Sequence, residues 1–129
     1  MSPRALLAGS WTLLIFILCW LPRRYLPEGE RLPRTAFVPN VDKIVHMGIF
    51  FVFALLWMWA LRSAGRARRV VVAGLVLALL SEAGQELPIV RRDASLFDWL
   101  ADAAGIIVGI YAFKFASRHF EARVARPEA

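Results

Sequence analysis

Hydrophobic residues in this chain are gathered into long blocks separated by shorter polar stretches. The first block, residues 5–21, contains no charged residue. The second, residues 44–61, has His46 as its sole ionisable residue. Since a transmembrane helix needs about 20 predominantly apolar residues, each of these two blocks predicts a membrane-spanning helix.

Two later blocks reach this length only by taking in polar residues. The apolar run 70–80 is too short to cross a membrane by itself. A helix over 70–87, which Pro88 would end, takes in two glutamates and a glutamine in its final turns. The fourth predicted helix covers 98–115 and carries two aspartates in its first turns.

The pattern therefore predicts an all-α membrane protein, a bundle of about four transmembrane helices forming a single transmembrane domain over residues 1–129. A cleaved signal peptide is the alternative for the first block. No small-x-small cleavage site follows that block, and we expect an uncleaved helix. The tail from Ser117 is polar, and a helical continuation along the membrane interface is one option for it.

Composition supports the membrane interpretation. Hydrophobic residues make up 59% of the chain and the mean hydropathy is +0.55, whereas soluble domains are about 45–50% apolar. The net charge of +6 would suggest nucleic acid in a soluble protein. Here the basic residues lie beside apolar blocks, so membrane lipids and not nucleic acid are the expected partners. The single cysteine, Cys19, excludes an internal disulfide and a cysteine-based metal site.

Charge also predicts an orientation. Four helices place both termini on the side of the loop between the second and third blocks, where four arginines fall within residues 62–69. The predicted location is the plasma or inner membrane of the cell. The positive-inside rule then places both termini in the cytoplasm. Arg23 and Arg24, directly after the first block, argue for the opposite orientation.

Polar residues gather at the other, external end of the predicted bundle. Residues four apart share a helix face, and Asp42 with His46, Glu82 with Glu86, and Asp98 with Asp102 all have this spacing. Arg91, Arg92 and Asp93 lie in the loop between the last two helices. The candidate binding site comprises eight of these residues: Asp42, Lys43, His46, Glu82, Gln85, Arg92, Asp98 and Asp102.

Gly105 and Gly109 extend the Asp98–Asp102 stripe, and small residues there predict close helix packing. Glu82 and Asp102 lie deepest, so they should face the bundle interior and find partners such as Arg91, Arg92 or Lys43. Simpler roles are open for others: Asp42 as a helix N-cap, His46 as a polar contact within the bundle, and one of the two arginines as a headgroup anchor.

The order of these residues resembles the VanZ-like family of small bacterial membrane proteins. The resemblance covers about residues 42–113. It rests on Asp42-Lys43-x-x-His46, on Glu82-x-x-Gln85, and on Arg92 with Asp98 six residues later, followed by Gly105 and Gly109. The family commonly has Asn where this chain has Asp102, which adds a possible negative charge here.

The resemblance implies a multi-pass protein of the bacterial inner membrane that acts in the cell envelope. The family is named for a member linked to low-level resistance to the glycopeptide teicoplanin, so antibiotic resistance is a possible role for this chain. The family does not supply a reaction. The primary hypothesis is an external-face polar pocket that binds the headgroup of a lipid-linked or cell-wall precursor, with Lys43 and Arg92 holding a phosphate.

Three alternatives stay open, and so does the question of whether the protein is an enzyme. In a membrane enzyme acting on a lipid-linked substrate, Asp42 would orient His46 as general base and Glu82 or Asp102 would be the acid. A proton-coupled transporter or flippase and a purely structural ion-paired lock are the others. Within the enzyme hypothesis, a divalent metal held by His46, Glu82, Asp98 and Asp102 is an alternative, because these ligand types suit hard or borderline ions. We expect no cofactor and no metal, since no tight ligand signature such as His-Glu-x-x-His is present. The oligomeric state is not determined by the sequence.

Overall fold

The computed structural model describes residues 2–20, 41–87 and 96–124, without the side chains of residues 41, 42 and 124. The described part is four α-helices with no strand: α1 Pro3–Trp20, α2 Val41–Ala60, α3 Arg66–Gln85 and α4 Leu96–Val124. The all-helical prediction is therefore confirmed.

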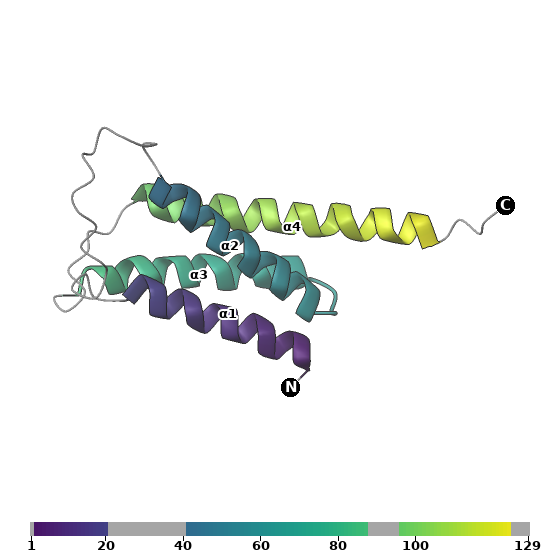
Figure 1. Ribbon diagram of the computed structural model, residues 1–129, viewed down its shortest axis with the longest axis horizontal. Coiled ribbons are helices and arrows are strands. Elements are labelled where there is room, and N and C mark those ends of the chain that lie inside the picture. Colours follow the sequence, from purple (N-terminus) through teal and green to yellow (C-terminus); the bar gives the residue numbers. More distant parts are fainter. Residues whose placement is uncertain (1, 21–40, 88–95, 125–129) are drawn as a thin grey trace.

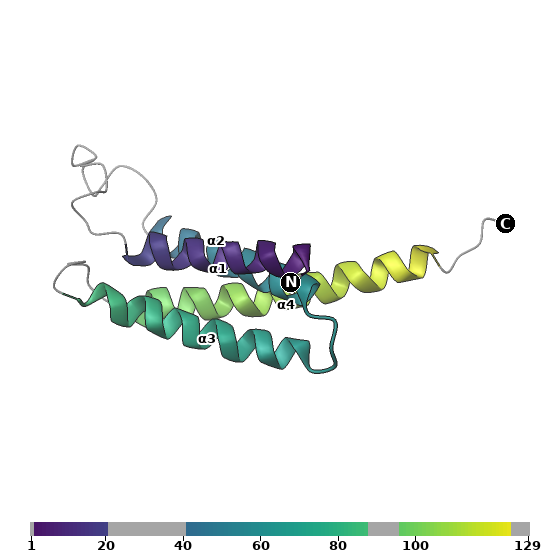
Figure 2. The ribbon, with the colours of Figure 1, turned by 90° about the horizontal axis from the view of Figure 1, so that it is seen from below.

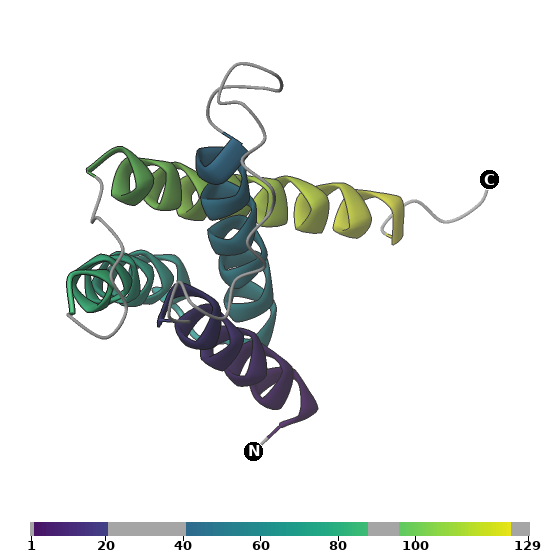
Figure 3. The ribbon, with the colours of Figure 1, turned by 60° about the vertical axis from the view of Figure 1, so that its left-hand side comes forward.

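The four helices run alternately up and down the bundle. The ends of α1 and α3 and the starts of α2 and α4 lie together at one end (Figure 1). We call this the cluster end, and the opposite end, where the chain starts and α2 connects to α3, the terminal end. In Figure 3, α2 passes between α1 and α4, and α2 and α4 form the most extensive helix pair. Helix α3 contacts all three other helices.

The first three helices begin two to four residues earlier than predicted and end one or two residues earlier. The fourth helix extends beyond its predicted end at residue 115, because α4 continues to Val124, and the helical option for the tail from Ser117 is the one observed. Residues 116–124 contain neither glycine nor proline and include the good helix formers alanine, arginine and glutamate. This continuation extends α4 past the terminal end of the bundle (Figure 2).

The outside of the bundle is more apolar than that of a water-soluble bundle, while the interior holds a hydrophobic core, which includes Ile15, Phe50, Phe53 and Ile106, together with a few polar side chains. Large apolar side chains are exposed along every helix, among them Leu13, Val45, Leu79 and Ile107. Buried positions include His46 and several carboxyl and amide side chains at the cluster end. Three helical segments are long and apolar enough to cross a membrane, namely Pro3–Trp20, Lys43–Ala60 and Leu96–Arg123.

Helix α3 differs because every 18-residue stretch of it contains Arg68, Arg69 and Glu82. Its exposed face between these charges is nevertheless apolar, with Val72, Val76 and Leu79 following one another at helical spacing.

Basic and aromatic side chains pair at the terminal end. The Arg4 guanidinium lies 4.7 Å from the ring centre of Trp59, and the Arg66 guanidinium lies 5.0 Å from that of Phe113. These contacts join α1 to α2 and α3 to α4. Such amphipathic pairs are typical of the membrane interface, where the ring meets lipid and the cation meets water.

Two glycines of α4 allow α2 to approach closely. A Cβ atom at Gly105 would collide with the backbone carbonyl of Met47. A Cβ atom at Gly109 would lie 2.7 Å from the carbonyl oxygen of Phe51 and 2.8 Å from the Cβ of Ala54. The stripe that the sequence assigned to helix packing thus faces α2, and its neighbours there are mainly backbone atoms, which cannot move aside independently.

We expect Gly109→Ala to lower the free energy of unfolding by about 1–3 kcal/mol through overpacking against α2. Gly48→Ala is the matched control, because a Cβ there meets nothing within 4 Å. It should be neutral or stabilising, since alanine is the better helix former by up to about 1 kcal/mol. The measurement is the melting temperature in detergent. A thiol-reactive fluorophore reports it, because the buried thiol of Cys19 becomes reactive when the bundle unfolds. Equal melting temperatures for the two variants would contradict the packing role.

Candidate functional site

The alternating helix order brings the first turns of α2, the last turns of α3 and the first turns of α4 together at the cluster end. With a rise of 1.5 Å per residue, His46 lies about 8 Å inside the start of α2 and Asp102 about 9 Å inside the start of α4. Glu82 lies about 5 Å before the end of α3. The polar side chains therefore occupy one layer, one to two turns below the end of the bundle.

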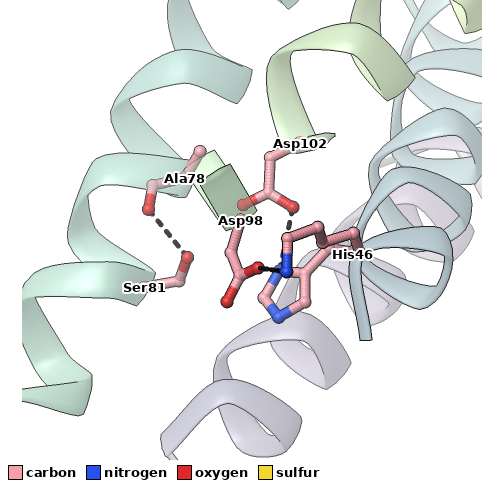
Figure 4. A network of polar contacts seen from close by, with 6 residues as sticks. His46, Ala78, Ser81, Asp98 and Asp102 are labelled. Atoms are coloured by element: carbon pink, nitrogen blue, oxygen red, sulfur yellow. Dashed lines mark hydrogen bonds and ion pairs between the residues drawn. The ribbon is translucent and has the colours of Figure 1, made fainter. Parts of the chain in front are cut away.

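His46 and Asp102 form the centre of this layer. The Nδ1 atom of His46 lies 3.0 Å from Oδ1 of Asp102, and Asp102 is completely buried (Figure 4). When Asp102 is ionised, Nδ1–H donates to its carboxylate, and in the neutral imidazole Nε2 is then the nitrogen with a lone pair. The contact spans α2 and α4, and it holds the imidazole ring in one orientation.

Lys43 and Asp98 form the outer edge of the layer. The Lys43 Nζ lies 3.7 Å from Oδ1 of Asp98, with side chains 32% and 13% exposed. The distance is that of an ion pair beyond hydrogen-bonding range. Lys43 is the most accessible of the polar side chains described here, so this edge is where the layer meets the outside of the bundle.

Helix α3 contributes Glu82 and Gln85, both buried, on its inward face. Ligand atoms of His46, Glu82 and Asp98 all lie within 4.8 Å of one another, so three helices bring one polar atom each to a common point. The Nε2 atom of Gln85 and the Oδ2 atom of Asp102 are buried without a hydrogen-bond partner among the described residues.

Five of the eight predicted site residues come together in this layer: Lys43, His46, Glu82, Asp98 and Asp102. We call these five the polar cluster. Gln85 lies buried one turn after Glu82. Asp42 is in the first turn of α2, but its side chain lies outside the described residues, as does Arg92, together with Arg91 and Asp93.

The hydrogen-bond contact of His46 Nδ1 is with Asp102 on another helix, a pairing that the sequence did not predict. The sequence suggested Asp42, four residues away on the same helix, as the carboxylate that orients His46. The side chain of Asp42 lies outside the described residues, so that pairing stays a prediction.

Ser81 is a buried polar residue that sequence reasoning did not single out. Its position four residues before Gln85 was the available signal. Its hydroxyl donates to the carbonyl oxygen of Ala78 at 2.8 Å, so it is satisfied within its own helix (Figure 4).

Chemically, this cluster combines an oriented imidazole, three carboxylates and one ammonium group. It can bind a cation through its carboxylates, contact an anionic group through Lys43, or transfer a proton through His46.

No protein-family model matches the chain, and neither does any curated protein or solved structure. The resemblance to the VanZ-like family therefore stays a prediction that rests on the residues quoted for it.

We expect Asp102→Asn to preserve the fold, because its amide oxygen can still accept the hydrogen bond from His46. Asp102→Ala should cost about 1–3 kcal/mol of unfolding free energy by leaving a buried ring N–H unpaired. The matched control is Asp98→Ala, one turn earlier, which should cost less because Lys43 can reach solvent. Thermal unfolding in detergent measures all three. An Asn variant as unstable as the Ala variant would show that this hydrogen bond contributes nothing.

Proposed function

We propose that the chain is an integral membrane protein of the bacterial inner membrane, related to the VanZ-like family, with four spans. Its polar cluster binds the polar headgroup of a lipid-linked cell-wall precursor at the external face. The single observation that carries this proposal is a buried group of polar side chains near one end of a bundle whose exterior is apolar. Large apolar residues are exposed along the outside of the bundle, and Lys43 and Asp98, with side chains 32% and 13% exposed, lie at the accessible edge of the buried polar layer.

The exposed face of α3 supports a fourth span. Val72, Val76 and Leu79 would meet lipid tails, while Glu82 is only 6% exposed and would not. Arg68 and Arg69 lie in the first turn of α3, at the same end as the Arg4–Trp59 and Arg66–Phe113 pairs. Long basic side chains at that position reach the headgroup region, so their charge does not prevent insertion.

The basic terminal end supports cytoplasmic termini by the positive-inside rule. The cluster end then faces the outer leaflet, where lipid-linked cell-wall precursors expose their headgroups. Lys43 is the accessible cation that would contact an anionic headgroup. The glycopeptide connection, which comes only from the family resemblance, fits a ligand of this class.

A membrane enzyme is the second candidate, and the His46–Asp102 pair is the observation that favours it. A buried carboxylate that fixes the tautomer of an imidazole is a common way to prepare a general base. His46 would then remove a proton from water or a hydroxyl at the lipid-linked substrate. Product formation from such a substrate distinguishes this candidate from binding alone.

Labelling of introduced cysteines tests the four-span topology. In a Cys19→Ala background, we expect Ser63→Cys and Leu87→Cys to react with a membrane-impermeant maleimide from opposite sides of the membrane. Both residues are exposed; Ser63 precedes α3 in the chain and Leu87 follows it. If α3 lies along one surface instead, the two cysteines will label from the same side and the proposal of four spans will fail.

Antibiotic sensitivity of the host tests the proposed site. In a deletion strain, we expect Lys43→Gln and Glu82→Gln to reach normal abundance in the membrane, yet to return glycopeptide and lysozyme sensitivity to that of the deletion. The matched controls are Lys114→Gln, which lies on α4 near the terminal end of the bundle, and Glu86→Gln, which lies one turn after Glu82 and is exposed. Both should complement fully. A phenotype that falls only in proportion to abundance would identify the cluster as a structural lock.

A further inference from the structure

The point where α2, α3 and α4 meet has the composition of a metal site. One imidazole nitrogen and two carboxylate oxygens, from His46, Glu82 and Asp98, lie within 4.8 Å of one another. Each ligand comes from a different helix, so the arrangement exists only in the folded bundle. We propose that this cluster binds one divalent transition-metal ion, with His46, Glu82 and Asp98 as its protein ligands.

The separation of the ligand atoms is close to what an ion requires. Bonds from Zn²⁺ to nitrogen or carboxylate oxygen are about 2.0–2.2 Å long, so two ligands at a tetrahedral angle lie about 3.3–3.6 Å apart. Since the three ligand atoms lie within 4.8 Å of one another, binding of the ion would draw the side chains together by at most about 1.5 Å.

Asp102 provides an independent observation in favour of the ion. Histidines that bind metals usually donate their other ring N–H to a carboxylate, which fixes the tautomer and strengthens the ligand. The contact from His46 Nδ1 to Asp102 at 3.0 Å has this form, and it leaves Nε2 for the ion. The Oδ2 atom of Asp102, in a side chain with no exposure, has no hydrogen-bond partner in the described part of the chain.

The charge of the polar cluster also favours a cation. It brings the carboxylates of Glu82, Asp98 and Asp102 together with the single ammonium group of Lys43. Like charges at short range in a low-dielectric interior repel strongly, and a divalent ion would reduce this repulsion. The imidazole ligand favours Zn²⁺ over Mg²⁺ and Ca²⁺, which prefer oxygen ligands, while the carboxylates also suit Mn²⁺.

With three protein ligands, the ion would keep a coordination position for water or for an anionic oxygen of a ligand. This last role rests on the proposed headgroup function, whereas binding of the ion itself does not. Binding of metal to the purified protein without lipid substrate therefore tests the site, and the host phenotype tests the function separately.

The chain offers two matched pairs for the experiment. It contains only two histidines, and the second, His119, is exposed on the part of α4 that extends past the terminal end. On α3, Glu82 is buried and Glu86 is exposed one turn later. His119→Ala and Glu86→Gln thus remove the same chemical groups as His46→Ala and Glu82→Gln, but away from the proposed site.

The test is a calorimetric titration of chelator-treated protein, purified in detergent without a histidine tag, with Zn²⁺, Mn²⁺ and Mg²⁺. We expect one Zn²⁺ or Mn²⁺ per chain and weaker binding of Mg²⁺. His46→Ala and Glu82→Gln should weaken binding by roughly 100-fold or more, and Asp102→Asn by roughly 10–100-fold with the stoichiometry unchanged. His119→Ala and Glu86→Gln should bind like the unaltered protein.

Pulsed electron paramagnetic resonance of the Mn²⁺-loaded, unaltered protein gives a direct second reading, because a bound imidazole produces ¹⁴N modulation of the echo. This measurement tests whether an imidazole binds the ion, even if the His46→Ala variant fails to fold. Absence of stoichiometric binding, absence of the ¹⁴N signal, or equal affinities within the two matched pairs would each overturn the proposal.

Discussion

The close approach of α2 to α4 is the constraint on which the rest of the structure depends. At Gly105 the backbone carbonyl of Met47 occupies the space that a side chain would need. His46 directly precedes Met47, and Asp102 lies one turn before Gly105. The missing Cβ atom and the histidine–aspartate hydrogen bond thus belong to the same helix interface. A larger residue at the glycine would separate the helices and with them the two polar groups, since side-chain hydrogen bonds tolerate only a few tenths of an ångström.

Because the exterior of the bundle is apolar, the polar side chains depend on the α2–α4 interface for partners. In hydrocarbon, a polar side chain has no water to bind, so it is stable only when it faces the interior and meets another polar group. If the bundle spans a membrane, it meets this condition by placing the buried carboxylates near one end, where the burial cost would be smaller than at the membrane centre. The opposite end carries arginines stacked on aromatic rings, an arrangement suited to a membrane interface. The two ends thus differ in chemistry, and among the described residues the cluster end brings polar groups from three helices to one point.

A structural lock and a binding site place different demands on such a cluster. A lock needs only that every polar group find a partner. The buried Asp102 oxygen and Gln85 nitrogen that have no hydrogen-bond partner among the described residues exceed what a lock requires. Buried groups left in this state usually indicate a function or a bound species. The proposed ion would account for the negative charge of the cluster, and the ion pair at its edge would leave Lys43 placed to contact a ligand from outside.

The sequence by itself determined the helical class, the approximate extent of three helices, the end of the bundle that carries the polar residues, and the α4 face that carries Gly105 and Gly109. These properties follow from local rules, because residue spacing defines a helix face and apolar length defines a helix that can meet lipid. Which polar side chains contact one another across helices was decided by the tertiary structure alone. His46 meets Asp102 from another helix, and Glu82 lies beside His46 and Asp98. Such contacts depend on the crossing angle and axial register of neighbouring helices, which close packing between helices sets and which spacing along one helix does not encode.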